Sequence, residues 1–205
     1  MIQALIVVAA ASAATPPPAV GKPIRSMTYT FVYSTQLAQD QGTIYADVMS
    51  VTKDGGLIIR FSQPATGPGT QAFGSADCTV YGDARVLCQK QGALSMFENE
   101  LAHLLGRNFV NGNAMDEKNH WHLANSDASA ALVDDFTVTS NDHGILNISE
   151  IRDFTSDGVI THHVATITYD MNKTVPTHVH FIDSAKDQPT VSMSVDLTLQ
   201  SDSMH

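Results

Sequence analysis

The sequence predicts a mainly β (α+β) protein: a single curved antiparallel sheet or half-barrel of roughly eight to ten strands, with one central amphipathic helix packed on it. Most of the chain alternates apolar and polar residues with a period of two, which is typical of strands that bury one face. One stretch, residues 92–106, instead repeats apolar residues at helical spacing. Because short turns separate the strands, neighbours pair antiparallel, and a sheet of that size must curl or close.

Composition favours one β-rich domain at residues 26–205. The 205 residues are 43% hydrophobic, which is enough for one substantial core. Residues 1–14 form an apolar run that ends in small residues, as a secretory signal peptide does, and residues 15–25 form a Pro-rich linker. We therefore expect export to the periplasm, the cell surface or the extracellular space. The alternative is that the apolar run, too short to span a membrane, stays on the mature chain as a strand.

The charge pattern argues against two classes of partner. Lys and Arg number 11 against 21 Asp and Glu, which gives a formal net charge of -10, and the sequence contains no basic cluster. Nucleic acid and anionic membrane surfaces are therefore poor partners. The sequence also contains no G-x-S-x-G, C-x-x-C, H-E-x-x-H or phosphate-binding glycine loop, so it identifies no reaction and favours a non-enzymatic protein.

Turn residues separate the expected strands. Residues 53–56, Lys-Asp-Gly-Gly, predict one hairpin, and residues 170–173, Asp-Met-Asn-Lys, predict another. The strands expected on this basis are residues 27–34, 43–52, 57–61, 120–124, 136–140, 145–154, 159–169, 174–183 and 191–199.

The 2 cysteines, Cys78 and Cys88, lie in a further hairpin that turns near Gly82. A three-residue loop sets Cys78 opposite Cys88 and Val80 opposite Val86, whereas a two-residue loop leaves the cysteines out of register. In an oxidising compartment we expect a disulfide between them, worth about 2–3 kcal/mol.

Residues 92–106 predict the helix. Ser95 and Glu98 have the form of a capping box, and Gly106 suits a C-terminal stop. The apolar stripe of this helix consists of Leu94, Phe97, Leu101, Leu104 and Leu105. A helix of about four turns is too short to be stable alone in water, so it must pack on the sheet.

The order of these elements resembles that of a known family. An exported chain, an N-terminal meander, a central helix, a strand bearing Trp121 and long C-terminal hairpins are similar to the half-barrel lipoprotein carriers of the LolA, LolB and LppX kind. Stretches 104–110 and 118–123 are also similar to uncharacterised exported bacterial proteins. The resemblance carries over no individual residue, because that family recognises its ligand by the shape of an apolar cavity.

What the resemblance implies is a cavity for an apolar small molecule or lipid between sheet and helix. In that case Phe97, Leu101, Leu104 and Leu105 line the cavity from the helix. A filled core is the alternative, since any helix packed on a sheet needs an apolar stripe.

The spacing of the histidines indicates a possible metal site. His178 and His180 share one face of a strand, because side chains two residues apart point the same way. If residues 170–173 form the turn, His180 lies opposite His163, and a slip of one residue brings His162 into the place of His163. In either register three imidazoles come within reach of one point. Neutral imidazoles favour Zn or Cu, and three of them with an open position match a catalytic zinc site. The alternative is an exposed histidine patch, with Pro176 marking a bulge or an edge.

Three hypotheses of function follow. The first is an exported, non-enzymatic carrier that holds an apolar or lipid-like ligand. The second is a structural or surface-assembly protein, which self-associates when a retained strand at residues 2–14 adds to a neighbour's sheet edge. The third is a His-rich metal-binding protein.

Overall fold

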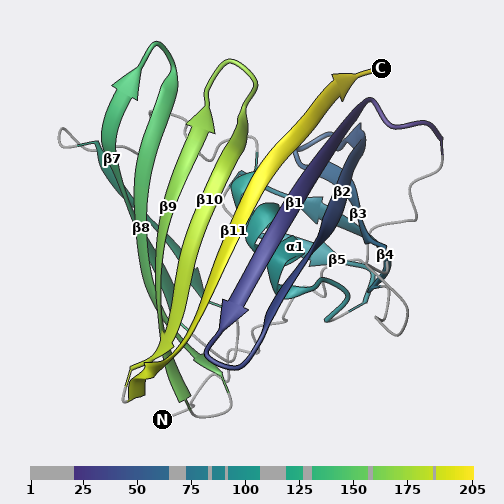
Figure 1. The fold of residues 1–205 in the computed structure, drawn as a ribbon. Helices are drawn as coiled ribbons and strands as arrows, with labels where there is room; N and C mark the ends of the chain where they lie inside the picture. The colour runs from purple at the N-terminus through teal and green to yellow at the C-terminus, as the bar shows by residue number, and fades with distance from the viewer. Residues whose placement is uncertain are drawn as a thin grey trace, which may run out of the picture.

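The computed structural model describes residues 21–64, 73–82, 85–90, 92–106, 119–126, 131–156, 159–186 and 188–205. These residues form one open antiparallel sheet of 11 strands with one helix, which confirms the predicted fold class (Figure 1). The expected signal peptide at residues 1–14, and with it the strand proposed for self-association, lies outside the described residues. None of the described residues belongs to a helix long and apolar enough to cross a membrane.

The elements follow one another along the chain as β1 (Arg25–Thr35), β2 (Gln39–Val51), β3 (Leu57–Gln63), β4 (Phe73–Val80), β5 (Val86–Cys88), α1 (Met96–Leu104), β6 (His120–Ser126), β7 (Ala131–Asp142), β8 (Ile145–Ser156), β9 (Val159–Asp170), β10 (Val175–Ala185) and β11 (Gln188–Met204).

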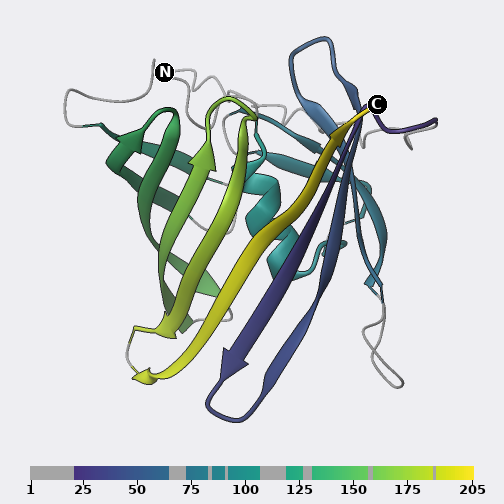
Figure 2. The ribbon, with the colours of Figure 1, turned by 45° about the horizontal axis from the view of Figure 1, so that its top comes forward.

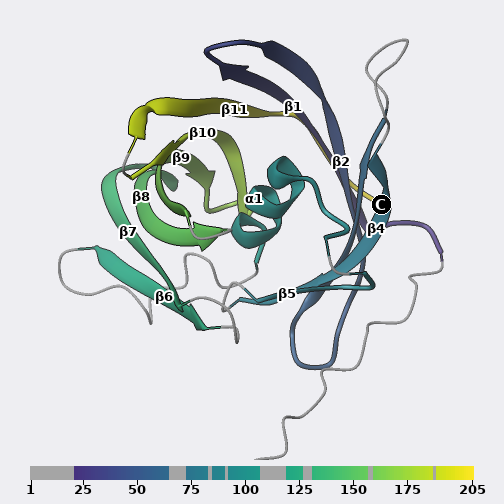
Figure 3. The ribbon, with the colours of Figure 1, turned by 90° about the horizontal axis from the view of Figure 1, so that it is seen from below.

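Two meanders meet in the middle of the sheet. The strand order is β5-β4-β3-β2-β1-β11-β10-β9-β8-β7-β6. Strands β1 to β5 therefore run outward from the centre to one edge, and β6 to β11 return from the other edge until β11 pairs with β1. Helix α1 lies between β5 and β6 in the chain, so it belongs to the connection that joins the two edges. Seen end-on, the sheet curves around α1, with β1 and β11 on one side of the helix and the edge strands on the other (Figure 3).

The concave face of the sheet and α1 share one hydrophobic core. Alternate residues of each long strand point towards the helix, which lies across this face (Figure 2). The core side chains that belong to β1, β2, β3 and α1 are Met27, Tyr29, Phe31, Ile44, Ala46, Val48, Ile59, Phe61, Leu101, Ala102 and Leu104. Strands β8 to β11 add Leu146, Ile148, Ala165, Ile167, Tyr169, Val175, Val179, Phe181, Val195 and Leu197.

Helix α1 begins where the capping box predicts, but it is shorter than expected. The Ser95 hydroxyl accepts a hydrogen bond from the Glu98 amide at 3.2 Å, and the Glu98 carboxylate accepts one from the Ser95 amide at 2.8 Å. The helix covers 9 residues, because the chain before Ser95 still turns through Gly92 at φ +68. Gly106 serves close packing after the helix ends: a Cβ there would lie 2.6 Å from the carbonyl oxygen of Tyr81.

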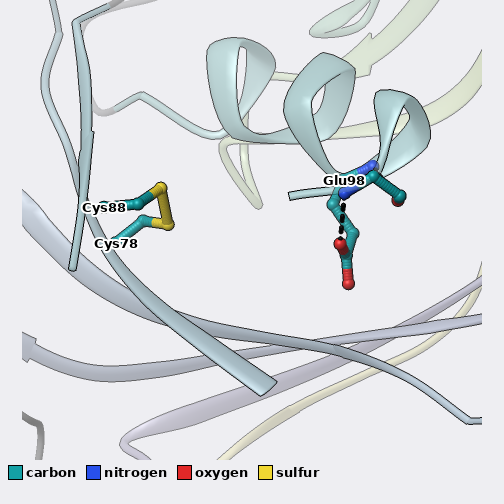
Figure 4. Close-up of a disulfide and its surroundings, with 4 residues drawn as sticks. Cys78, Cys88 and Glu98 are labelled. Carbon is teal, nitrogen blue, oxygen red and sulfur yellow. Dashed lines mark hydrogen bonds between the residues drawn. A yellow bond between two sulfur atoms is a disulfide. The ribbon is translucent and has the colours of Figure 1, made fainter. Parts of the chain in front are cut away.

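The cysteine hairpin has the register that a three-residue loop predicts. Cys78 pairs with Cys88 and Val80 with Val86. A disulfide joins the two cysteines and ties the short edge strand β5 to β4 (Figure 4). The buried Glu98 side chain beneath α1 is visible in the same view.

An ion pair links the two strands that join the meanders. On β1, the Arg25 guanidinium donates through Nε and Nη2 to the Asp202 carboxylate on β11, each at 2.7 Å, and Nη2 also donates to the Lys173 carbonyl at 2.8 Å. The hydrogen bond from Arg25 lowers the pKa of the Asp202 carboxyl below its ordinary value.

We predict that replacing both cysteines by alanine lowers the free energy of unfolding by about 3 kcal/mol, because the bond no longer restricts the unfolded chain. Urea unfolding of both proteins, with and without reductant, measures this loss. Reductant should destabilise the wild type and leave the Cys78→Ala/Cys88→Ala protein unchanged. Equal stability of the two oxidised proteins would contradict the prediction.

We also predict a loss of stability in acid that depends on Asp202. Since its pKa is lowered in the folded state, the unfolded chain binds the proton more readily, and stability falls as the pH drops below about 4. Urea midpoints at pH 5 and pH 3 should therefore differ less in Asp202→Asn than in the wild type. The control is Asp142→Asn at the exposed end of β7, which should keep the wild-type slope.

Candidate functional site

A row of charged side chains faces α1 from four neighbouring strands. Asp134 on β7 pairs directly with Arg152 on β8, Arg152 pairs with His163 on β9, and His163 pairs with Asp183 on β10. Residues directly opposite each other in an antiparallel pair project from the same face of the sheet. All four side chains therefore lie on the concave face, where the rest of the sheet carries apolar core residues.

Arg152 lies at the centre of this cluster. Its Nη2 donates to Glu100 Oε2 at 2.6 Å, and its Nη1 donates to Glu150 Oε1 at 3.1 Å. Its Nε lies 3.9 Å from Asp134 Oδ1. Because Glu100 belongs to α1 and the other groups belong to the sheet, the guanidinium connects the helix to β7 and β8 by charge-assisted hydrogen bonds and ion pairing.

His163 is fully buried beside the arginine. Its Nδ1 lies 2.6 Å from Asp183 Oδ1, so Nδ1 donates to the carboxylate and fixes the ring orientation. Its Nε2 faces Glu100 Oε1 at 3.8 Å and Glu150 Oε1 at 3.9 Å. Both distances are beyond a hydrogen bond, so this nitrogen lies between two carboxyl groups without bonding to either.

Four carboxyl groups thus surround one guanidinium and one imidazole. Burial raises the pKa of Glu150 well above its ordinary value, the charge of Glu100 raises it further, and Arg152 opposes both. Burial raises the pKa of Asp134 to about 6, against the charge of Arg152. Burial acts in the same direction on Glu100, but the charges of Arg152 and His163 outweigh it and lower its pKa. The cluster therefore contains more carboxyl groups than its one guanidinium can balance, and burial favours the neutral forms of Glu150 and Asp134.

The same strands expose aliphatic side chains on the convex face. Ile151, Val164 and Ile182 are 47%, 39% and 41% exposed, and they are direct neighbours across β8, β9 and β10. Burying an ion costs several kcal/mol, so a sheet selected for stability alone would place the aliphatic groups inside. This inverted polarity makes the charged cluster a candidate functional site.

Of this cluster, the sequence predicted only His163 as a site residue, although β8 carries a signal for its partners. Leu146 and Ile148 alternate on the inward face, and the same alternation continues through Glu150 to Arg152. Two charged residues on the apolar face of a strand predict buried partners. Glu100 has no comparable signal, because only the packing of α1 shows that its side chain is buried.

The three histidines expected to bind metal do not come together. His163 faces α1, whereas His178 and His180 lie on the convex face, 3.4 Å and 3.0 Å from Asp196 Oδ1. The expected pairing of His180 with His163 is wrong, since His180 pairs with Thr166.

Two local features change that register. The turn comprises residues 171–174 rather than 170–173, and a bulge between Pro176 and His178 inserts one extra residue into β10. The hydroxyl of Tyr29 on β1 holds the bulge by donating to the Pro176 carbonyl at 3.0 Å. Because one extra residue turns every later side chain to the opposite face, the bulge points His178 and His180 outward.

The four residues expected to line a ligand cavity take different positions. Leu101 and Leu104 are buried in the core, and Phe97 stacks on Phe31 with 4.3 Å between ring centroids. Leu105 lines a pocket of about 290 Å³ at the C-terminal end of α1. Side chains therefore fill the space between the sheet and the middle of the helix, and the pocket lies at its end.

This pocket has an apolar floor and an exposed apolar rim. Its floor consists of core residues, namely Met27, Val48, Ile59, Leu105 and Val175. At its rim, Ile24, Val51 and Met204 are 45%, 40% and 78% exposed. A wider groove of about 650 Å³ lies beside Met96 at the other end of the helix, and Asp183 of the charged cluster contributes to its lining.

No protein-family model, curated protein or solved structure matches this chain.

We predict that Arg152→Met lowers the free energy of unfolding by about 3–5 kcal/mol, because it leaves the buried carboxyl groups without their cation. Urea unfolding at pH 7 measures the loss. The matched control is Arg60→Met, which breaks a cross-strand pair with Asp77 that is more exposed and should cost at most about 1 kcal/mol. Adding Glu150→Gln to Arg152→Met should recover part of the loss, and equal losses for the two arginine variants would refute the prediction.

Proposed function

We propose that this chain is an exported, non-enzymatic binding protein that holds a small, neutral, apolar ligand in the pocket at the C-terminal end of α1. The observation that carries the proposal is the combination of an apolar floor with exposed aliphatic residues at the rim. Exposed aliphatic side chains that continue into a concave apolar site are typical of ligand-binding pockets. Leu105, one of the residues expected to contact a ligand, lies in this pocket.

The charges around the pocket favour a neutral ligand. Among the described residues that line the pocket, Arg25 and His205 are basic. The Arg25 guanidinium is already bonded to the Asp202 carboxylate and the Lys173 carbonyl. An anionic head group would have to compete with a bidentate ion pair, which is among the stronger polar interactions in proteins. A free fatty acid is therefore a weaker candidate than an uncharged hydrocarbon chain or ring.

The size of the pocket limits the ligand further. Its volume of about 290 Å³ is near the lower end of the range for ligand sites, which is about 300–1,000 Å³. A short acyl chain, a single ring system or the end of a longer chain suits such a volume. A complete two-chain lipid does not.

Two features support export. Residues 1–14 have the composition of a signal peptide, and the Cys78–Cys88 disulfide is of the kind that persists in oxidising compartments. An open sheet curved around one helix is also the architecture that the resemblance to half-barrel carriers implies.

We predict that the protein binds the neutral fluorophore N-phenyl-1-naphthylamine and that straight-chain alcohols displace it. Each added CH₂ should strengthen displacement by about fourfold, equivalent to about 0.8 kcal/mol, until the pocket is full. Fluorescence titration over a series of chain lengths measures both effects. Displacement that does not depend on chain length would count against an apolar pocket.

A matched pair of variants locates the binding. Val51→Trp fills the rim of the pocket and should weaken binding of the fluorophore at least tenfold. Val164→Trp adds the same bulk on the convex face, where Val164 is exposed, and should leave binding unchanged. Equal affinity in the two variants would place the fluorophore elsewhere and overturn the proposal.

A further inference from the structure

We propose that Glu100, Glu150 and His163 bind a divalent first-row transition metal ion between α1 and the concave face of the sheet. The site is separate from the apolar pocket: its ligands belong to the charged cluster, which adjoins the groove beside Met96, whereas the pocket lies at the other end of the helix. The inference therefore stands or falls independently of the proposed ligand.

The donor atoms converge. One donor from each of the three residues lies within 4.8 Å of the others, and all three residues are buried. The His163 Nε2 atom is 3.8 Å from Glu100 Oε1 and 3.9 Å from Glu150 Oε1. An ion about 2.0–2.2 Å from nitrogen and oxygen donors needs only small side-chain shifts to contact all three.

Each of the three residues has a buried polar atom with no hydrogen-bond partner among the described residues. These atoms are Glu100 Oε1, Glu150 Oε2 and His163 Nε2. Most buried polar groups in proteins are hydrogen-bonded, and each exception is costly. Two of these atoms, Glu100 Oε1 and His163 Nε2, face each other at 3.8 Å, and one ligand shared by the three residues would satisfy all of them. Because two of the donors are carboxylate oxygens, that ligand is a cation.

The surrounding residues orient the ligands as outer-shell groups do in metal sites. Asp183 accepts the Nδ1 hydrogen of His163 at 2.6 Å, which directs the Nε2 lone pair into the site. Arg152 donates to Glu100 Oε2 and to Glu150 Oε1, which leaves Glu100 Oε1 and Glu150 Oε2 without a hydrogen bond. Of these two atoms, Glu100 Oε1 is the one that lies 3.8 Å from His163 Nε2. This pairing of a carboxylate with a ligating imidazole is a recurrent feature of zinc sites.

The donor set selects the class of metal. Imidazole nitrogen suits Zn²⁺ and its first-row neighbours, whereas Mg²⁺ and Ca²⁺ prefer oxygen donors alone. A site with three protein ligands also retains a coordination position for water or another small donor.

A route from solvent leads close to the site. Asp183 lines the groove of about 650 Å³ together with Phe154, Thr161 and Met193. The Asp183 carboxylate is partly exposed there and is bonded directly to His163. An ion that enters this groove therefore first meets a carboxylate that is hydrogen-bonded to one of the proposed ligands.

The test is titration of chelator-treated protein. Binding of Zn²⁺ is measured by calorimetry, and binding of Co²⁺ by calorimetry and by its visible absorption. The wild type and a His178→Asn/His180→Asn variant are compared, so that the exposed histidines beside Asp196 are accounted for. We expect one equivalent of metal in both proteins. We also expect Asp183→Asn to weaken binding about 10- to 100-fold, and Glu150→Gln or His163→Gln to weaken it at least as much.

Two control variants change groups of the same type that lie nearby but outside the proposed site. Glu98→Gln neutralises another buried carboxyl group on the same helix, and His162→Gln removes the neighbouring imidazole on the opposite face of β9. Both should bind metal as the wild type does.

Unchanged affinity in Glu150→Gln and His163→Gln, or loss of binding only when His178 and His180 are replaced, overturns the proposal. Absence of binding to the wild type also overturns it and leaves protons as the cations that balance the cluster.

A measurement on the wild type alone remains decisive if a variant fails to fold. X-ray absorption of the Zn²⁺-loaded protein should show one imidazole with oxygen donors. Two or more imidazoles per ion would place the metal at another histidine group and refute the assignment.

Discussion

The pairing of β1 with β11 is the contact on which the rest of the structure depends. These strands lie at opposite ends of the chain, and their antiparallel ladder joins the two meanders into one sheet. The bidentate contact between Arg25 and Asp202 adds a partly buried ion pair to this ladder. Such a long-range pairing carries a large loop-closure entropy, which the core beneath it must offset.

The concave face that this pairing creates is covered by one short helix. Its 9 residues are too few for stability in isolation, so its capping box and its contacts with the sheet hold it in place. The contacts are of two kinds. Leu101 and Leu104 pack in the apolar core, and Glu100 bonds to Arg152 on β8. The helix therefore has one side in an ordinary core and another in a charged cluster.

The two ends of the curved sheet differ in chemistry, because one side of α1 faces an apolar core and another faces the charged cluster. Where α1 ends, aliphatic residues of β1, β2 and β3 continue beyond the helix and form an apolar pocket. Towards the other end, β7 to β10 each direct a charged residue inward, and β8 to β10 direct aliphatic residues outward. Burying charged groups in this way costs stability. We therefore propose that the charged cluster binds a ligand and does not serve packing alone.

The sequence by itself determined the strands, the capping box at Ser95 and Glu98, and the pairing of Cys78 with Cys88, because period-two alternation, helix caps and hairpin registers depend on neighbouring residues. It also placed Leu105 among the candidate ligand contacts. Only the tertiary structure decided which face His163 occupies. The turn at residues 171–174 and the bulge at Pro176 set the register of β10. The bulge is held by Tyr29, which is distant in the chain. Likewise, Glu100 meets its partners only because α1 crosses the sheet, and no local pattern encodes that crossing.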